Sequence, residues 1–368
     1  MREPKRIVVK VGTAVISDPS GRLDVPTMTS IVEDVGRIVK QGKKALIVSS
    51  GAIAAGVERL GLQKRPSSIP KLQAAASIGQ GLLVHRYSEL FGRQGIPVGQ
   101  VLVTQFDTTH RQQYLNARNT LSRLLDYGAV PIINENDTTA VDEIKFGDND
   151  TLAAMVTLLA GADMLVLLSD IPGLHTGDPR VDERAKLLHT IEEIDEKVEA
   201  LAGGVGSKFG RGGMVTKIQA AKIVTSAGIP MVIADGRQPG IVGRIVSGER
   251  VGTYFAPAKK SLAAKKLWIA YGRIPQGTVV VDDGARQALC FGGRSLLPAG
   301  VTKVEGRFDV GDAVDIADSS GRVFARGLTN FTSHELAEIK GRRTDEVAGI
   351  VPGQENEEVV HRDCLALL

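Results

Sequence analysis

The 368-residue chain contains few cysteines, few aromatic residues and no long apolar run. Its two cysteines, Cys290 and Cys364, lie far apart and form no CxxC pattern, so we expect reduced thiols rather than a disulfide or a metal site. Aromatic residues make up 4% of the chain, too few for a surface that stacks the bases of single-stranded nucleic acid. No apolar stretch reaches membrane-spanning length and the N-terminus does not resemble a signal peptide, so we expect a cytoplasmic protein without membrane contact.

A large excess of one charge is also missing. The net charge is +3, and residues 261–368 hold 13 Lys and Arg against 15 Asp and Glu, a balance of −2. Neither part of the chain has the basic character of a polyelectrolyte binder, which argues against RNA binding by the C-terminal part. The chain does contain 43% hydrophobic residues over a length that exceeds a usual single core, which predicts two globular domains.

Short apolar segments alternate with longer helical patterns through the first two-thirds of the chain. The segments are rich in Val, Ile and Leu, as in strands buried on both faces of a parallel sheet, and they read RIVVKVG, KALIVSSG, PVGQVLVT, AVPIINEN, MLVLLSD and IPMVIADG. Helices are predicted over 26–41 and 214–227, with Gly42 and Gly228 just beyond their ends. This alternation predicts an α/β fold with a mainly parallel sheet sandwiched by helices.

The pattern changes near residue 258. The segment GTYFAPAKKSLAAKK has the composition of a linker, and short β-like runs such as GTVVVDD and EVAGIVPG follow it. DIADSSGRVFARG predicts a hairpin that turns at DSSG, and SHELAEIKG predicts a helix with Ser333 as its N-cap. We therefore predict a first domain over 1–258, a linker over 259–276 and a small, mostly β domain over 277–368.

Glycines and small hydroxyls stand at the ends of several predicted strands, where open α/β sheets bind ligands. Lys10 lies inside the first strand, before Gly12 and Thr13, and its ammonium group reaches either an anion at the strand end or water along a sheet edge. Ser50 and Gly51 precede an Ala-rich helix whose N-terminus suits an anion, although an ordinary serine N-cap is the simpler explanation for them.

Two further stretches suit phosphate groups. Ser169 and Asp170 leave a buried strand and enter a Pro-Gly turn, and turn chemistry alone explains Asp170 poorly. A glycine-rich loop over 206–213 runs into a helix that carries Lys217, an arrangement that suits a triphosphate. Neither GxxxxGK[ST] nor GxGxxG after a strand is present, so the loop is not a P-loop or a dinucleotide motif.

Acids and amides gather just beyond the strand AVPIINEN, at 134–137 and 148–150. Three explanations compete: a cation site, a substrate site and a well-solvated loop. The spacing does not match a calcium-binding EF-hand loop, and the six histidines are scattered without metal-ligand spacing, so we predict no protein-bound metal.

Taken together, the motifs resemble the amino-acid kinase family, and within it the branch that phosphorylates L-glutamate. They occur in the family's order, over essentially the whole chain, as VVKVGTAV, VSSGAIAAG, PIINENDTTA, IKFGDNDTLAA, LLSDIPGLHTGDP and GRGGMVTKIQAA. The pair of INEND and GDND is the most specific part of the resemblance. Residues from about 277 to 350 look like a PUA domain, which other branches of the family lack.

The resemblance implies transfer of a phosphoryl group from ATP to the γ-carboxylate of L-glutamate, giving L-glutamyl 5-phosphate for proline biosynthesis. A glutamate side chain has a pKa of roughly 4.3, so the attacking carboxylate is already ionised and needs no general base. Lys10 and Lys217 would flank the transferring group, and Asp150 would orient both lysines. Mg²⁺ would bridge the ATP phosphates.

The other site residues are implied by the same resemblance. Glutamate would contact Ser50, Gly51, Asn134, Asp137, Asp148 and Asn149. ATP would contact Lys10, Gly12, Thr13, Ser169, Asp170, Arg211, Gly212, Gly213, Met214, Val215, Thr216 and Lys217. Asp137 suits the α-ammonium group of glutamate. Ser169 and Arg211 depart from the family, which usually has a threonine and a small residue there.

Partners are implied as well. The family's members suggest a homo-oligomer, a dimer or a tetramer, with feedback inhibition by proline at a site that overlaps the glutamate site. The acyl phosphate product is labile, which implies hand-over to a glutamyl-phosphate reductase. Two other functions stay open: a sibling kinase that acts on another carboxylate or a carbamate, and an RNA-binding module carried by the PUA-like domain.

Overall fold

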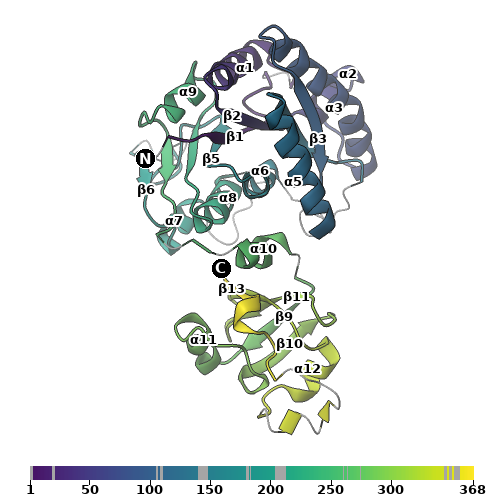
Figure 1. The fold of residues 1–368 in the computed structure, drawn as a ribbon, viewed down its shortest axis with the longest axis vertical. Coiled ribbons are helices and arrows are strands. Elements are labelled where there is room, and N and C mark those ends of the chain that lie inside the picture. Colours follow the sequence, from purple (N-terminus) through teal and green to yellow (C-terminus); the bar gives the residue numbers. More distant parts are fainter. Residues whose placement is uncertain are drawn as a thin grey trace. The chain divides into compact units, whose positions relative to one another are not determined.

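The chain folds into two compact units, 1–261 and 262–368 (Figure 1). The computed structural model describes residues 3–18, 21–104, 107, 111–139, 148–179, 182, 184–203, 213–259, 261–262, 264–273, 275–343, 346–347, 350–351 and 357–368. Helix α10 (Ala264–Gly272) lies within the segment predicted as a linker. The domain limits of 1–258 and 277–368 therefore stay a prediction.

An eight-stranded sheet forms the centre of the first unit. Its strands follow the order β3-β4-β2-β1-β5-β7-β8-β6, and all neighbours are parallel except the pair of β7 and β8. The strands are β1 (Arg6–Val11), β2 (Lys44–Ser49), β3 (Val98–Val103), β4 (Val130–Glu135), β5 (Met164–Ser169), β6 (Thr190–Ile191), β7 (Met231–Asp235) and β8 (Thr253–Phe255). The mainly parallel sheet and its six predicted strands are confirmed.

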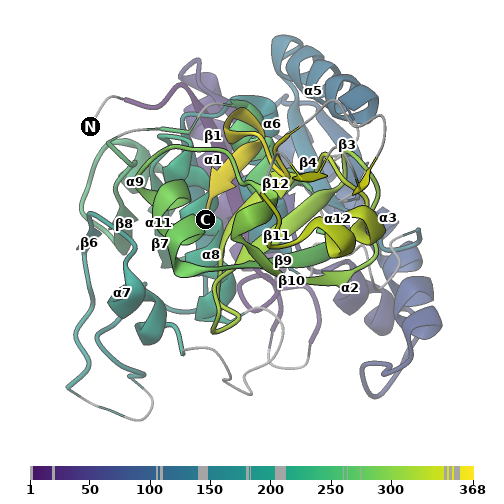
Figure 2. The ribbon, with the colours of Figure 1, turned by 90° about the horizontal axis from the view of Figure 1, so that it is seen from below.

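Helices cover both faces of this sheet (Figures 1 and 2). Alternate residues of β1, namely Ile7, Val9 and Val11, pack in one buried cluster with apolar side chains of α1, α3 and α9. Helices α5, α6 and α8 cover the opposite face. Lys10 points toward this face, since it pairs with Asp150 of α6. The helices are α1 (Val25–Lys40), α2 (Ala52–Arg59), α3 (Ile69–Gly92), α5 (Arg111–Asp126), α6 (Asn149–Ala160), α7 (Glu196–Leu201), α8 (Met214–Ser226) and α9 (Ile241–Val246). The predicted helices over 26–41 and 214–227 are α1 and α8.

The second unit is built on a five-stranded sheet in the order β10-β9-β11-β12-β13. Its elements are β9 (Gly277–Val281), α11 (Asp283–Cys290), β10 (Val301–Gly306), β11 (Ala313–Ala317), β12 (Val323–Leu328), α12 (Ser333–Ile339) and β13 (Leu365–Leu367). Strands β11 and β12 form the predicted hairpin, whose turn closes through the Gly321 N–H and the Asp318 carbonyl. Helix α10 packs on this unit through Ile269 and Ala270, and Arg326 of β12 donates to the carbonyls of Ala270 and Arg273.

Two local predictions in this unit are wrong. The N-cap of α12 is Thr332 rather than Ser333, because the Thr332 hydroxyl and the Glu335 carboxylate form a reciprocal capping box. EVAGIVPG is not a strand: of its described residues, Glu346, Val347 and Ile350 are helical and Val351 lies in a bend. Val347 is buried, and its carbonyl accepts from the Val351 N–H four residues on, so the valine spacing suits a helix.

Among the residues described, no helix combines the length and the apolar character that crossing a bilayer requires.

Candidate active site

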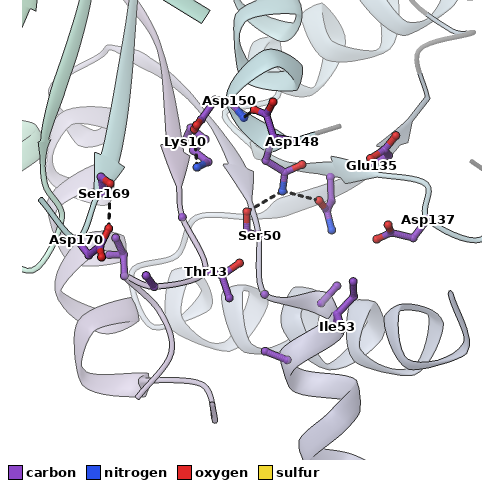
Figure 3. Close-up of a pocket in the computed structure, with 18 of the residues that line it drawn as sticks. Lys10, Thr13, Ser50, Ile53, Glu135, Asp137, Asp148, Asp150, Ser169 and Asp170 are labelled. Carbon is purple, nitrogen blue, oxygen red and sulfur yellow. Dashed lines mark hydrogen bonds and ion pairs between the residues drawn. The ribbon is translucent and has the colours of Figure 1, made fainter. Parts of the chain in front are cut away.

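Four neighbouring strands, β4, β2, β1 and β5, end at one edge of the parallel sheet. A cavity of about 530 Å³ opens there (Figure 3). Most of the predicted site residues line it together: Lys10, Gly12, Thr13, Ser50, Gly51, Asn134, Asp137, Asp148, Asn149, Asp150, Ser169, Asp170 and Lys217. The topology explains this meeting, because carboxyl ends of parallel strands share one edge of a sheet.

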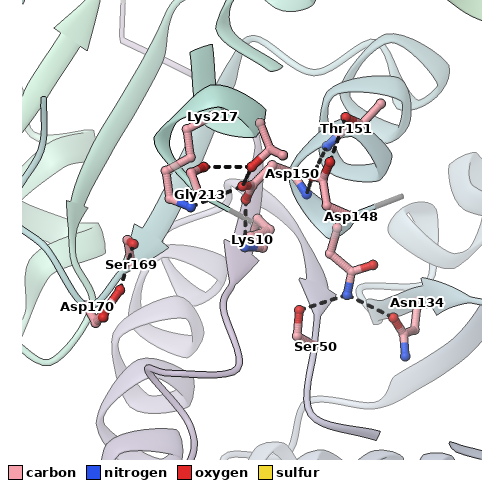
Figure 4. A network of polar contacts seen from close by, with 12 residues as sticks. Lys10, Ser50, Asn134, Asp148, Asp150, Thr151, Ser169, Asp170, Gly213 and Lys217 are labelled. Carbon is pink, nitrogen blue, oxygen red and sulfur yellow. Dashed lines mark hydrogen bonds and ion pairs between the residues drawn. The ribbon is translucent and has the colours of Figure 1, made fainter. Parts of the chain in front are cut away.

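One carboxylate bridges two lysines at the inner side of the cavity (Figure 4). The Nζ atom of Lys10 lies 2.6 Å from Oδ1 of Asp150, and the Nζ atom of Lys217 lies 3.1 Å from Oδ2. All three side chains are buried, so the cluster holds a net charge of +1 away from bulk water. The alternative that Lys10 lies along a sheet edge is wrong, because β1 is an interior strand between β2 and β5.

The first turns of two helices supply the rest of this cluster. Asp150 lies in the first turn of α6, and Lys217 lies in the first turn of α8, where Thr216 donates to Asp150 Oδ2 at 2.8 Å. Burial opposes ionisation of Asp150, but Lys10 and Lys217 outweigh it and lower the pKa of this carboxyl. Asp150 is therefore ionised at neutral pH and fixes both ammonium groups.

Four polar side chains form a chain of hydrogen bonds on the other side of the cavity. Asn149 Nδ2 donates to Ser50 Oγ at 2.8 Å and to Asn134 Oδ1 at 3.0 Å, and Asn134 Nδ2 donates to Gln80 Oε1 at 2.9 Å. Ser50 is not the N-cap of α2, so the simpler explanation for it is wrong. Gly51 holds the N-cap position with a φ of 106°, and this leaves the serine hydroxyl against Asn149.

Asp148 is first of all the N-cap of α6. Its Oδ1 atom accepts from the backbone N–H groups of Asp150 at 2.6 Å and Thr151 at 2.9 Å. Burial and the neighbouring Asp150 charge raise the pKa of Asp148, against the opposing effects of those N–H groups and of Lys10. The carboxylate therefore lines the cavity while it also supports the helix that carries Asp150.

We expect Asp148→Asn to preserve stability at pH 7, because asparagine caps helices as well as aspartate does. The raised pKa means that the folded state disfavours the ionised carboxyl, so the neutral amide removes a cost rather than adding one. Asp148→Ala should lower the free energy of unfolding by about 1 kcal/mol. Chemical denaturation of both variants tests this, and equal destabilisation would show that the cap is not the stabilising feature.

Some of the residues predicted for ATP line the same cavity, namely Lys10, Gly12, Thr13, Ser169, Asp170 and Lys217. The Gly12 N–H donates to the Leu168 carbonyl at 3.2 Å, and Ser169 Oγ donates to Asp170 Oδ1 at 3.2 Å. Gly213 is the N-cap of α8, Met214 and Val215 follow it in the first turn, and Thr216 donates to Asp150. None of these four residues is among the described lining residues of the cavity. Arg211 and Gly212 lie outside the described residues.

Some residues of the site were not predicted from the sequence. Arg65, Gln73 and Glu135 also line the cavity, and Gln80 lies behind Asn134. Glu135 belongs to the INEND motif. Gln73 and Gln80 belong to no motif and lie on α3, and Arg65, also outside any motif, lies between α2 and α3. In the described part of the chain, no group of three or more His, Cys, Asp or Glu side chains could hold a metal ion.

Comparison with known proteins is consistent with this geometry. The sequence model of the amino acid kinase family matches residues 5–235, and that of the PUA domain matches residues 277–351. Relatives called glutamate 5-kinase are similar along their whole length. The one from Caldanaerobacter subterraneus is 46% identical over 99% of this chain and 98% of its own. The one from Carboxydothermus hydrogenoformans is 47% identical over 100% of this chain and 99% of its own.

Proposed function

Because the chain belongs to the amino acid kinase family, we propose that it transfers the γ-phosphoryl group of ATP to the γ-carboxylate of L-glutamate. The observation that carries this proposal is the buried cluster of Lys10, Asp150 and Lys217 at the carboxyl edge of the sheet. It supplies two fixed positive charges without a general base, which is what an ionised carboxylate nucleophile and a phosphoryl donor require.

In this reaction an oxygen of the γ-carboxylate attacks the γ-phosphorus of ATP. The bond between that phosphorus and the bridging oxygen to the β-phosphate breaks, and ADP leaves with the bonding electron pair. Two anions must approach each other, so Lys10 and Lys217 stabilise the equatorial oxygens of the transferring group. Asp150 does not touch the reacting atoms in this scheme; it holds the two ammonium groups at the required separation.

The side chains of Ser50, Asn149, Asn134 and Gln80, joined by hydrogen bonds, are called the amide chain here. The acceptor is proposed to bind beside the lysine cluster, where the amide chain reaches the cavity. Ser50 and Asn134 offer neutral donors to the carboxylates of glutamate, Asn149 Oδ1 offers an acceptor to its α-ammonium group, and Asp137 offers that group a negative charge. The nucleotide is proposed to lie on the other side, against Gly12, Thr13, Ser169, Asp170 and the N-terminus of α8. The order of the strands supports this division, because β5 and β4 lie on opposite sides of β1 and β2.

Mg²⁺ is proposed to arrive on the ATP phosphates. In the described residues no group of three or more His, Cys, Asp or Glu side chains suits a protein-held ion. Two carboxylates of the cavity are already engaged: Asp150 faces an ammonium group at each oxygen, and Asp148 caps α6. The charge neutralisation that the protein itself contributes is therefore assigned to Lys10 and Lys217.

Trapping of the acyl phosphate product with hydroxylamine tests the reaction. Purified full-length protein with ATP should form a hydroxamate with L-glutamate, and little or none with N-acetylglutamate, L-aspartate or carbamate. Hydroxamate formation from one of those compounds, without formation from L-glutamate, would instead identify a sibling kinase.

Asp137→Ala is expected to raise the KM for glutamate by about one to two orders of magnitude, with the KM for ATP little changed, because a charge-assisted hydrogen bond contributes ~1.5–3 kcal/mol. Steady-state kinetics with each substrate varied in turn checks this. Asp137→Asn is the matched variant: it keeps the shape and loses the charge, so it should share the defect. An effect confined to ATP would move Asp137 out of the acceptor site.

Several wider properties are part of the same proposal. The kinase site would belong to a domain over 1–258, joined by 259–276 to a PUA-like domain over 277–368. A cytoplasmic homo-oligomer, inhibition by proline and hand-over of the product to a reductase are proposed on the same basis. The net charge of −2 over residues 261–368 gives no support to RNA binding as a second function.

A further inference from the structure

Gln80 stands behind the proposed acceptor site and does not line the cavity. It lies on α3, is 8% exposed, and accepts a hydrogen bond from Asn134 through Oε1. Its Nε2 atom is buried and finds no hydrogen-bond partner among the described residues. An unpaired buried amide lowers the free energy of unfolding. If Gln80 served only the fold, an apolar residue of similar length would give a more stable protein.

The hydrogen bond from Asn134 to Gln80 fixes the direction of the whole amide chain. Asn149 donates both hydrogens of Nδ2, one to Ser50 Oγ and one to Asn134 Oδ1. Asn134 must therefore present its oxygen to Asn149 and its nitrogen to Gln80. The reverse orientation of the Asn134 amide would set two NH₂ groups against each other on one side and two oxygens on the other. Gln80 Oε1 favours the first orientation.

This direction decides what the site can offer to a ligand. Three polar groups are left over from the hydrogen bonds between these four side chains: Asn149 Oδ1, the Ser50 hydroxyl hydrogen and the second Asn134 N–H. A ligand in the cavity is therefore offered one acceptor, Asn149 Oδ1, and two donors, the Ser50 hydroxyl and the Asn134 N–H, at fixed positions. Without Gln80 Oε1, the Asn134 amide keeps one orienting partner, Asn149, instead of two, so its two orientations come closer in energy and the order of donors and acceptor is less strictly set.

The position of Gln80 is itself held closely. Its neighbour Gly79 faces α2 so tightly that an added Cβ would lie 1.8 Å from the Ala52 carbonyl oxygen, and a Cβ on Gly56 of α2 would lie 1.8 Å from the Ala75 carbonyl oxygen. Further along α3, Tyr87 Oη lies 2.9 Å from Ser49 Oγ at the end of β2. The two helices are thus in backbone contact, and α3 is tied to the strands that carry Ser50 and Asn134.

We propose that Gln80 is a positioning residue for the acceptor: its carboxamide oxygen sets the orientation of Asn134 and, through it, the hydrogen bonds that Asn149 and Ser50 offer to glutamate. The inference rests on the proposed function, because it assigns the acceptor to this amide chain. It needs no contact between Gln80 and the ligand.

Gln80→Met tests the proposal in the full-length enzyme. We expect the KM for glutamate to rise about tenfold, the equivalent of one hydrogen bond of ~1.4 kcal/mol, while the KM for ATP and the melting temperature stay near those of the parent. Leu83→Met is the matched control, since Leu83 is buried on the same helix and makes no polar contact; its kinetics should be unchanged. Gln80→Leu carries the same expectation if Gln80→Met does not fold.

A double-mutant cycle with Asn134→Ala separates positioning from packing. If Gln80 acts only through Asn134, adding Gln80→Met to Asn134→Ala should change the KM for glutamate by less than about twofold. A full tenfold effect in that background, or an unchanged KM in Gln80→Met alone, would overturn the inference. If Asn134→Ala and Asn149→Ala both leave the KM for glutamate unchanged, the acceptor site itself is misassigned, and the proposed use of the cavity fails with it.

Discussion

Replacing Lys217 with alanine is expected to lower kcat by about 10²–10³-fold, the scale of losing one preorganised charge or donor at a transition state. The KM values should move much less, because the lysine interacts most strongly with charge that develops during transfer. The fold should survive, since Asp150 keeps its ion pair with Lys10 and its hydrogen bond from Thr216. Lys10→Ala is expected to lower kcat by the same order of magnitude.

Lys222→Ala provides the control for this prediction. Lys222 lies on the same helix as Lys217, is partly exposed, and pairs with Glu199 rather than with a residue of the cavity. Its removal should leave kcat within about twofold, because exposed ion pairs contribute little. Single-turnover measurements with bound ATP report the transfer step directly. Near-normal transfer in Lys217→Ala would remove this lysine from the mechanism and leave Lys10 as the main cation.

The sheet was predictable because its strands are buried on both faces. Continuous runs of Val, Ile and Leu identify such strands, and all six expected segments appear in it. Strands β6 and β8 were not predicted. They have two and three residues, so they leave no periodic pattern to find, and tertiary pairing at the sheet edge decides whether they exist.

The cavity was predictable to the extent that topology alone creates it. Motifs at the ends of parallel strands must meet at one edge, which brings Lys10, Ser50, Asn134 and Ser169 together from distant parts of the sequence. Contributions from α3 were not predictable in this way. Gln80 reaches Asn134 only because Gly56 and Gly79 let two helix backbones touch, and nothing in the local sequence around Gln80 distinguishes it from a core position.

Capping residues show a finer limit of sequence reasoning. At Ser50 and Ser333 the predicted N-cap was one residue away from the real one, because two adjacent residues were both suited to the role. Gly51 takes the N-cap of α2 since its φ is positive, and Thr332 takes that of α12 through its reciprocal bond with Glu335. Backbone conformation made the choice at Gly51, and hydrogen-bond geometry made it at Thr332.

Asp150→Asn should abolish most activity and also destabilise the fold, because it leaves two buried ammonium groups without a counter-charge. Removing one partner of a buried ion pair costs roughly 3–5 kcal/mol. An asparagine can accept from one lysine only, and its NH₂ group would face the other. Denaturation at pH 7, with kcat measured on the folded protein, checks both expectations; a stability near that of the parent would mean that the lysines do not depend on this carboxylate.

The same substitution predicts a dependence on pH and a partial rescue. The lowered pKa of Asp150 stabilises the parent protein above the ordinary carboxyl pKa of 3.8, and this contribution is lost as the pH falls through the lower value of the folded state. The stability gap between parent and Asp150→Asn should therefore narrow in acid. Adding Lys217→Met to Asp150→Asn removes one uncompensated charge and should recover part of the stability, while kcat stays low because a transition-state cation is gone. Recovery of activity together with stability would instead assign Asp150 a purely structural role.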